Sequence, residues 1–514
     1  MKLIQKVLKI INGIFFPCPR TWMLDEKLVR WSRVGPTLTV GGSFEGNLAV
    51  GASGSGKTSG PIRINAIAMM RAGYGILAQT VKGTKPSDAD LIREWAIEAG
   101  RERSLVFVGP GHDLGFNVLR HEMDAARRKG EPGDMAANVA ALFSAAAELS
   151  SSTRNRIAGD TIWAHAVGSL VRHATSLVYA ATADLQLDDI VEVVRSAPQT
   201  IAQSRDPSFS RDSACMRMIE AANIINPANR NVLLATSYFL NEFPSFPPET
   251  KQSVIFSFGA GCADFFQRPP LCNMFFSRTD YTPSIILDGA ILVIDCPVLE
   301  YGEVGRIANG LLRLCTQRTL ERRAGHPGER PVALLWDESQ KTLMRSDVSF
   351  QETCRSSRCA TIAGTQHLPA LRDAVGPDLA ANFAGNLRNK FFAQNNEPDT
   401  TDFMSRLGAK QEVKRRTINR GEHGITGSTE ASHPEDALPA HATHNLRTGG
   451  RANRFKIDAI LVVGSKRMRS GKPFQRVVID QRRVMPSWWP LSNRARVTAC
   501  QRPAPDFRYL RRVS

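Results

Sequence analysis

The stretch that most constrains the fold runs from Asn47 to Thr58 and reads NLAVGASGSGKT. A short apolar run leads there into the spacing Gly-x-x-x-x-Gly-Lys-Thr, the pattern of a phosphate-binding loop. Glycines at these positions let the backbone turn with positive φ, so that its N–H groups can surround phosphate oxygens. Because strand, loop and helix signals follow in the required order, we predict a nucleotide-binding loop rather than a glycine-rich turn beside a single lysine.

The side chains of this loop have separate predicted roles. Lys57 is expected to reach the β- and γ-phosphates of ATP, and Thr58 to offer its hydroxyl to Mg²⁺. The next segment, Ile62 to Met70, lacks glycine and proline, and we expect a helix whose N-terminus favours negative charge. The residues predicted to contact the nucleotide are Gly51, Ala52, Ser53, Gly54, Ser55, Gly56, Lys57 and Thr58.

Strand and helix signals alternate on both sides of a long helical block. Buried strands are predicted at Gly75–Thr80 and Ser104–Val108, and helical spacing then dominates from about Asn117 to Ala263. Strand signals return at Ile291–Ile294, Val332–Trp336 and Ala360–Thr365. We therefore predict an α/β fold, a RecA-like P-loop NTPase core whose mostly parallel sheet has helices on both faces and is interrupted by an inserted all-α domain.

The expected domain boundaries follow from these changes of pattern. Residues 412–455 are polar, rich in Gly, Thr and His and without periodicity, which predicts a long mobile loop. Its histidines lack the cysteines or strand that a metal site would need, so a solvated loop is favoured. The expected parts are an N-terminal amphipathic segment (1–34), a nucleotide-binding domain (35–117 and 273–490), an inserted all-α domain (118–272) and a basic tail (491–514).

Two acids follow the predicted strand at Val332–Trp336. In a parallel sheet this strand ends at the edge where the phosphate loop also lies. We expect Asp337 to hold Mg²⁺ through water and Glu338 to act as the base for an attacking water. This conjunction of acid pair and phosphate loop predicts ATP hydrolysis.

Three further polar residues surround the strand predicted at Ala360–Thr365. Gln366 follows it and would sense the γ-phosphate if the strand lies beside the acid-bearing one. Arg355 and Arg358 precede it and are candidates to reach the ATP of a neighbouring subunit, where an arginine stabilises the charge on the transferring phosphoryl group. The alternative for each arginine is a solvated position at a helix end.

The net charge of +17 is concentrated near the C-terminus. From Asn445 to Ser514 there are seventeen Lys and Arg against three Asp, a net +14. Such a surface suits nucleic acid or anionic lipid, and a solvated basic tail is the alternative. The first seventeen residues place apolar side chains opposite Lys2, Lys6 and Lys9, which fits a helix lying on a membrane or packing on a partner.

Other features favour a cytoplasmic protein. The nine cysteines form no CxxC pair, which indicates reduced thiols. No stretch of the sequence is apolar and long enough to span a bilayer, so any membrane contact is expected to be peripheral, at the inner membrane.

Motifs along most of the chain resemble the VirD4/TraG family of type IV secretion coupling proteins, within the FtsK/HerA class of ring-forming DNA-pumping ATPases. The spacing from Arg355 to Gln366 is that of the family, which favours Arg355 over Arg358. Two positions depart from the family pattern, because Thr80 stands where Asp is usual and Val118 where Pro is usual. The matching segments are GASGSGKT (51–58), VKG (81–83), FNVL (116–119), GDTIW (159–163), DLQLDDIV (184–191), LLWDE (334–338), CRSSRCATIAGTQ (354–366) and KFFAQNNEPDTTDFMSRLG (390–408).

The resemblance implies an ATP-driven DNA translocase that delivers a relaxase–DNA substrate to a conjugation channel. It implies a homo-hexamer with ATP sites between subunits, and as partners DNA bound without sequence preference, relaxase or relaxosome proteins, and components of the type IV secretion channel. Two alternatives remain open: a substrate receptor or docking platform with weak ATPase activity, and a soluble DNA pump with no secretion partner.

Overall fold

The computed structural model describes residues 22–31, 36–129, 133–150, 160–259, 266–323, 328–421, 424–464, 468, 470–482, 506–507 and 510. Short runs of aliphatic residues form a nine-stranded sheet with the order β13-β12-β9-β3-β8-β7-β4-β6-β5. Its strands are β3 (Asn47–Val50), β4 (Gly75–Gln79), β5 (Leu105–Val108), β6 (Ile291–Ile294), β7 (Val332–Trp336), β8 (Cys359–Thr365), β9 (Asn389–Phe392), β12 (Lys456–Val463) and β13 (Phe474–Asp480).

Most of the sheet is parallel. The seven strands from β9 to β5 pair parallel to one another, and β12 pairs antiparallel with both β9 and β13. Alternate residues of each central strand face opposite sides, so that Leu77 and Leu334 join one hydrophobic cluster while Ile76 and Leu335 join another. The predicted α/β class with a mostly parallel sheet is confirmed.

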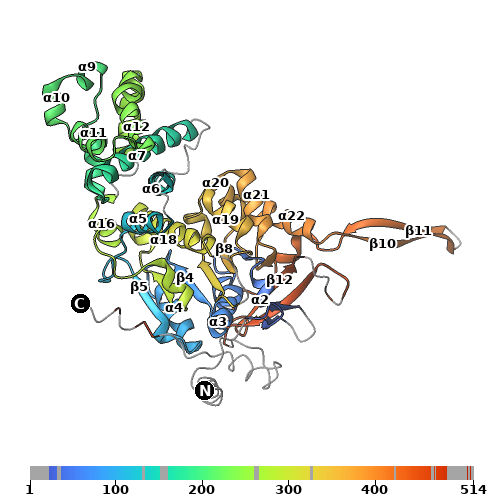
Figure 1. The fold of residues 1–514 in the computed structure, drawn as a ribbon. Helices are drawn as coiled ribbons and strands as arrows, with labels where there is room; N and C mark the ends of the chain where they lie inside the picture. The colour runs from blue at the N-terminus through green and yellow to red at the C-terminus, as the bar shows by residue number, and fades with distance from the viewer. Residues whose placement is uncertain are drawn as a thin grey trace, which may run out of the picture.

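Helices cover both faces of the sheet (Figure 1). One face packs against α3 (Arg63–Arg71), α4 (Asp88–Glu98) and a small unit made of the paired strands β1 (Lys27–Arg30) and β2 (Thr37–Thr39) with α2 (Val40–Ser43). The other face packs against α18, α19 and α20–α22. The bounds on that face are α17 (Val298–Tyr301), α18 (Glu303–Glu321), η7 (Ser339–Lys341), α19 (Arg345–Thr353), α20 (Leu368–Val375), α21 (Pro377–Asn386) and α22 (Pro398–Leu407).

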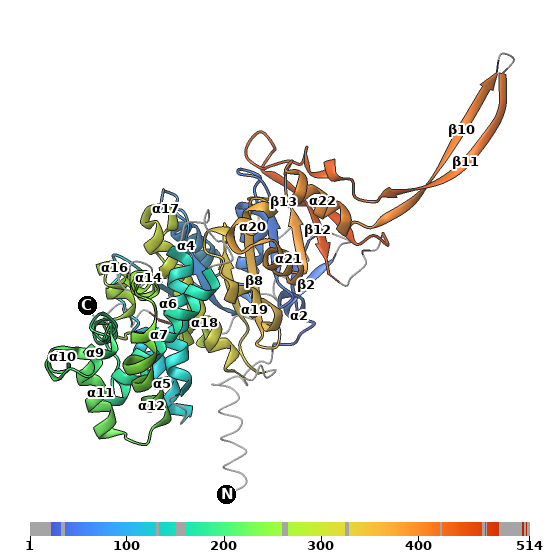
Figure 2. The same ribbon diagram turned by 90° about the horizontal axis from the view of Figure 1, so that it is seen from above.

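Among its described residues, the chain between β5 and β6 forms helices and connecting loops and no strand. Its helices α7–α12 rise away from the sheet, while α5, α6 and α16 lie close to α18 (Figures 1 and 2). The division of the chain at residues 118 and 272 stays a prediction. The helices are α5 (Val118–Lys129), α6 (Gly133–Ser150), α7 (Asp160–Thr182), α8 (Leu187–Arg195), α9 (Ile201–Ser204), α10 (Pro207–Asp212), α11 (Ala214–Ile225), α12 (Arg230–Ser237), η4 (Tyr238–Glu242), α13 (Phe243–Ser245), α14 (Pro248–Phe258), α16 (Pro269–Phe275) and η6 (Pro283–Asp288), with η2 (Glu102–Ser104) before β5.

The prediction of a loop without regular structure at residues 412–455 is wrong. Strands β10 (Lys410–Gly421) and β11 (Gly424–Asp436) pair there as a long antiparallel hairpin, which projects far from the body of the molecule (Figure 2). A helical turn, η8 (Ala440–Thr443), and the first residues of the loop before β12 follow. The sequence did not predict the hairpin because its residues show no alternation of apolar and polar side chains. A two-stranded ribbon that projects from the core has no buried face and therefore needs no such alternation.

Several sequence-based predictions lie outside the described residues. They are the amphipathic helix within residues 1–17, the first residue of the GDTIW motif and nearly all of the basic tail. Three tail residues are described, and one of them, Phe507, is buried against β5, where its N–H donates to the carbonyl of Arg103 at 3.0 Å. In the described part of the chain, no helix has the length and apolar composition needed to cross a membrane.

Gly75, at the start of β4, lies against the backbone of η6. A Cβ atom at this position would overlap the carbonyl group of Ile286. We expect Gly75→Ala to lower the free energy of unfolding by about 2 kcal/mol or more, because backbone must move to admit the methyl group. Gly385→Ala is the control, since its Cβ would meet no atom within 4 Å and helix α21 favours alanine over glycine. Equal urea midpoints for the two variants would contradict this packing.

Candidate functional site

The loop between β3 and the following helix is closely packed. The N–H of Gly51 donates to the carbonyl of Thr365 on β8 at 3.2 Å, and that of Ala52 donates to Gln394 beyond β9 at 3.0 Å. Gly54 and Gly56 have φ of 75° and 87°, the left-handed region that favours glycine. A Cβ on Gly56 would lie 2.7 Å from the side chain of Ile457 on β12, so both conformation and space require glycine there.

The helix after the loop begins earlier than the sequence predicts. A π-helical turn, η1 (Thr58–Ile62), directly follows Lys57 and runs into α3 after a kink at Gly60. The helix therefore begins several residues before Ile62, where the sequence predicted its start. The prediction missed the first turn because Gly60 and Pro61 are not typical of a helix interior. The early start brings Thr58 into the first helical turn, at the end where backbone N–H groups favour an anion.

Loop and acid pair meet at the carboxyl edge of the sheet. The Nζ of Lys57 lies 2.8 Å from Oε1 of Glu338, and both side chains are almost fully buried. The hydroxyl of Thr58 donates to the carboxylate of Asp337. These contacts join residues about 280 positions apart in the chain. They follow from the topology, because β8 lies between β3 and β7 and all three strands point the same way.

Glu338 is the most constrained of the acids. Its φ is 51°, a left-handed conformation that costs a non-glycine residue about 1 kcal/mol or more. Burial raises the pKa of Glu338, but the charge and hydrogen bond of Lys57 and the hydrogen bond from Gln340 outweigh it, so the pKa lies below its usual value. Glu338 is therefore an ionised carboxylate at neutral pH and can accept a proton.

Gln366 lies where its strand position predicts. Its Nε2 donates to Oε2 of Glu338 at 3.2 Å, and Nε2 of Gln340 donates to the same oxygen at 2.7 Å. The carbonyl of Gln366 accepts a hydrogen bond from Asn395 after β9, at 2.8 Å. The structure thus gathers the ends of β3, β7, β8 and β9 around one carboxylate.

The residues gathered here fit a nucleotide with a divalent cation. A side chain at Gly51 would collide with Ser55 and Ala393, so the loop requires glycine at this position. Without that side chain, the loop backbone can lie close to a bound ligand. The Oγ of Ser55 is buried and has no hydrogen-bond partner in the described structure, which leaves it available to a ligand. The hydroxyl of Thr58 and the carboxylate of Asp337 are the oxygen ligands that Mg²⁺ prefers, and Lys57 supplies positive charge for phosphate.

The two arginines before β8 have different environments. Arg358 is buried at a φ of 50°, donates to the carbonyl of Trp22 at 2.8 Å and lies over the ring of Phe44. Arg355 is exposed, beside a hollow lined by Leu24, Phe44 and Glu352. Both lie at the amino end of β8, about 20 Å from Gln366 along a seven-residue strand, so neither joins the acid pair of its own chain.

Two further polar residues, Asp88 and Thr80, lie near the site. Asp88, which sequence reasoning missed, accepts the N–H groups of Val81 and Lys82 at 2.7 and 2.8 Å. Burial raises its pKa, and the nearby charge of Asp337 raises it further. An acid directly after the N-cap Ser87 was the available signal. Thr80, which departs from the family pattern, is buried and donates to the carbonyl of Ile294 at 2.6 Å.

Known proteins share the fold of this chain and part of its sequence. Residues 331–446 match a family model described as the TraM recognition site of TraD and TraG. A search of curated proteins finds no match. The solved structures that match include the unbound conjugative coupling protein TrwBdeltaN70, with a TM-score of 0.59 and 16% identity over 90% of this chain and 92% of that one.

Two further matches are complexes of the plasmid coupling protein TrwB. The complex with the non-hydrolysable GTP analogue GDPNP has a TM-score of 0.59 and 16% identity, covering 92% of this chain and 93% of that one. The complex with ADP and Mg²⁺ has a TM-score of 0.58 and 16% identity, covering 89% and 90%. The predicted family resemblance is confirmed: residues 331–446 carry the domain of the TraG and TraD coupling proteins, within a chain that has the fold of TrwB.

Proposed function

We propose that this protein is an ATP-driven coupling protein that moves DNA, with its relaxase or relaxosome proteins, toward a type IV secretion channel. The observation that carries the proposal is the contact of Lys57 and Thr58 with Glu338 and Asp337 across β8. It supports nucleotide hydrolysis, and the likeness to TrwB, solved with ATP and GTP analogues and with ADP and Mg²⁺, supports the same chemistry here.

Each residue of the site has one role in this proposal. Backbone N–H groups of the loop from Gly51 to Gly56 bind phosphate oxygens, and Lys57 contributes positive charge to the same phosphates. Thr58 and Asp337 hold Mg²⁺, which neutralises charge on the phosphate oxygens when bound. Glu338 takes a proton from the attacking water, and Gln366 orients Glu338 through the hydrogen bond it already makes.

Arg355 completes the site from a neighbouring subunit. Its exposure at the opposite sheet edge suits a contact between subunits, whereas Arg358 is committed to the fold by its backbone contact with Trp22. A head-to-tail interface that closes on itself makes a ring, and a homo-hexamer is the assembly we propose.

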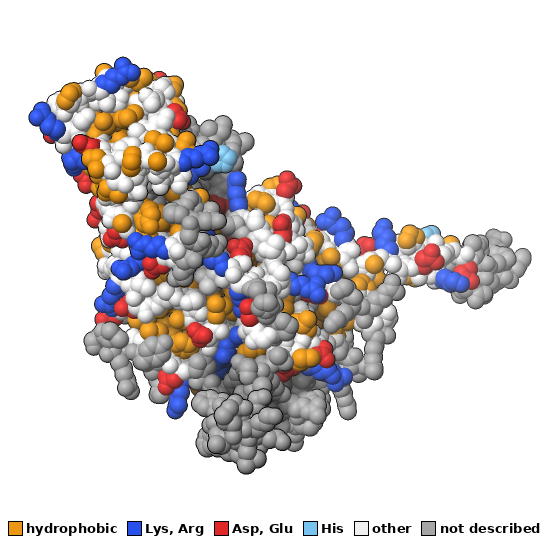
Figure 3. All heavy atoms as spheres, in the orientation of Figure 1, with side chains coloured by type: hydrophobic (Ala, Val, Ile, Leu, Met, Phe, Trp, Pro, Cys, Tyr) orange, Lys and Arg blue, Asp and Glu red, His pale blue; other side chains and the backbone are white. Residues whose placement is uncertain are grey.

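Protein partners are proposed for two other parts of the molecule. The family model for residues 331–446 is named for recognition of TraM by TraD and TraG, which supports docking of a relaxosome protein on this chain. The outer helices carry exposed apolar side chains, and hydrophobic patches are visible there in Figure 3. The exposed apolar side chains of these helices include Ile224 and Ile225 on α11, 74% and 58% exposed, and Leu233 and Leu234 on α12. Exposed apolar residues in a group favour a protein contact.

The first test concerns hydrolysis. Both Lys57→Ala and Glu338→Gln are expected to abolish ATP hydrolysis, for different reasons. The lysine variant should bind ATP weakly because it lacks the phosphate contact, whereas the glutamine variant should bind ATP and retain it. Hydrolysis assays with and without DNA, combined with binding of a labelled ATP analogue, separate these cases.

Wild-type hydrolysis by Glu338→Gln would remove Glu338 from the mechanism. Hydrolysis that is weak in the wild type and unaffected by DNA would favour a docking platform.

The second test concerns Arg355. We expect Arg355→Ala to lower kcat by roughly 100-fold or more while ATP binding persists, because an arginine supplied in trans acts on the transition state. Mixing Arg355→Ala with Lys57→Ala subunits should restore part of the activity, since some interfaces then pair an intact loop with an intact arginine. Absence of restoration in rings shown to be mixed would contradict a role in trans.

The third test concerns DNA. Binding is expected to ignore sequence and to weaken linearly on a log–log plot against salt, because each phosphate contact releases counterions with a slope of about 0.9 per phosphate. Exposed Arg451 and Arg454 and the basic tail are the proposed contacts. Replacing the six arginines from Arg494 to Arg512 with glutamine should reduce the slope in a fluorescence titration. Affinity that does not change with salt would reject binding led by phosphates.

A further inference from the structure

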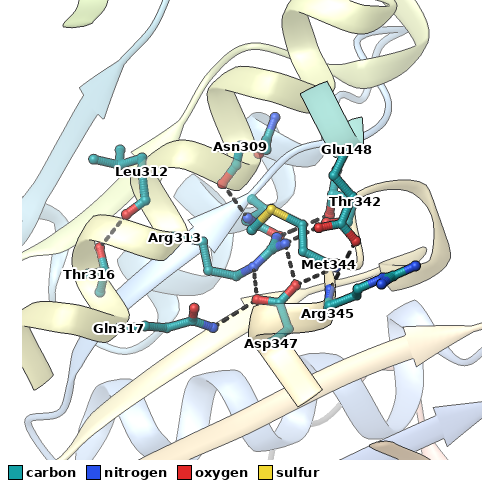
Figure 4. A network of polar contacts seen from close by, with 11 residues as sticks. Glu148, Asn309, Leu312, Arg313, Thr316, Gln317, Thr342, Met344, Arg345 and Asp347 are labelled. Atoms are coloured by element: carbon teal, nitrogen blue, oxygen red, sulfur yellow. Dashed lines mark hydrogen bonds and ion pairs between the residues drawn. The ribbon is translucent and has the colours of Figure 1, made fainter. Parts of the chain in front are cut away.

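A buried arginine on α18, Arg313, lies in a network of polar contacts with the start of α19 and the segment before it (Figure 4). Arg313 is fully buried, and each of its five N–H groups has an acceptor. Nε and one Nη lie 2.7 Å from the two carboxylate oxygens of Asp347, and the other Nη lies 2.7 Å from Oε1 of Gln79 at the end of β4. The remaining bonds reach the hydroxyl and the carbonyl of Thr342.

These contacts enclose the turn that carries the acids. The guanidinium of Arg313 lies over the ring of Trp336, 4.1 Å from its centroid, and Trp336 directly precedes Asp337. Thr342 follows the acids after the short helix η7. One side chain therefore holds the chain before and after Glu338. A non-glycine residue keeps a left-handed conformation, as Glu338 does, only where its surroundings impose it.

Asp347 extends this restraint into α19. Its carboxylate accepts the N–H of Met344 at 2.7 Å, which caps the first turn of the helix, and Gln317 of α18 donates to it at 2.8 Å. Helix α19 is nine residues long and ends at Thr353, and Arg355 lies two residues beyond that end. A helix of this length is a rigid rod of about 13 Å. The position of the first turn of α19 therefore determines where Arg355 lies, near the amino end of β8.

The inserted helices contact the same point. The N–H of Arg345, the first residue of α19, donates to the carboxylate of Glu148 on α6 at 3.0 Å, as Figure 4 shows. Leu149 of α6 packs against Gly310 of α18, where a larger residue would overlap it. The start of α19 is thus held jointly by α18 and by the helical block between β5 and β6.

We propose that Arg313, paired with Asp347, is a positioning residue for two groups at once: the acid-bearing turn at residues 337–342 and, through α19, Arg355. This inference rests on the proposed ATPase function. A guanidinium suits the task because its planar fork binds a carboxylate at two points and stacks on an aromatic ring, which a lysine cannot reproduce.

The experiment removes the pair without leaving a buried charge. Arg313→Met with Asp347→Leu replaces both partners by apolar groups of similar size, a change that proteins often tolerate. We expect kcat for ATP hydrolysis to fall roughly 10- to 100-fold, because small displacements of catalytic groups have such effects, while binding of an ATP analogue changes little. Arg313→Lys, which keeps one charged hydrogen bond, should retain more activity than Arg313→Met.

A second readout does not depend on hydrolysis. Amide hydrogen exchange across residues 336–353 should become faster in the double variant, with the melting temperature monitored in parallel. Arg318→Met is the matched control, because Arg318 lies on the same helix and pairs instead with Glu122 on α5. It should leave both kcat and exchange in this segment unchanged. If the wild type hydrolyses no ATP, the proposed function fails, and exchange alone decides the positioning role.

Three outcomes would overturn the proposal. One is a folded double variant with wild-type kcat, whether or not exchange changes. Another is an equal loss of activity in Arg318→Met, which would indicate general destabilisation. The third concerns α19: when the double variant is combined with Arg355→Ala, the losses should be less than multiplicative. Fully multiplicative losses would overturn the part that assigns the position of Arg355 to this pair.

Discussion

The arrangement of β8 between β3 and β7, with all three strands parallel, is the constraint on which the rest of the site depends. Parallel strands end at the same sheet edge, so the phosphate-binding loop, the acid pair and Gln366 are brought together by topology alone. Aliphatic side chains on both faces of these strands supply the burial that stabilises this order, and Lys57, the acid pair and Gln366 follow beyond the strand ends. The chemistry therefore lies where the hydrophobic core stops.

Within the site, the charges of buried side chains are balanced by an ion pair and hydrogen bonds rather than by water. Lys57 and Glu338 are buried together, and each would be costly to bury alone. Their ion pair keeps the carboxylate ionised, and Gln340 and Gln366 satisfy its second oxygen. In the proposed mechanism, a phosphate that draws the ammonium of Lys57 toward itself would also change what Glu338 contacts. Phosphate binding and the action of Glu338 as a base would then be linked through one hydrogen bond.

Helix α18 joins the sheet to the inserted helices. Arg313 on this helix holds the chain around the acids, Gly310 admits α6 at close range, and Arg318 pairs with Glu122 of α5. Because α19 begins in the same network and ends near Arg355, the two sheet edges are connected by a short rigid element. A rearrangement of the outer helices that moves α6 would therefore affect the acid-bearing turn through only a few contacts, those of α6 with α18 and α19.

The sequence by itself determined the elements and the local chemistry. The glycine spacing of residues 51–56, the aliphatic runs and the acids after Trp336 specify loop, strands and acid pair, because each depends on neighbouring residues only. It also indicated that Gln366 would lie at a strand end beside the acids. What it left open needed contacts between distant residues. These are the different environments of Arg355 and Arg358, the buried contacts of Arg313, the position of Asp88 near Asp337, and the hairpin β10–β11. A buried arginine and an exposed one look alike in sequence, since only the packing of the folded chain decides which partners surround each guanidinium.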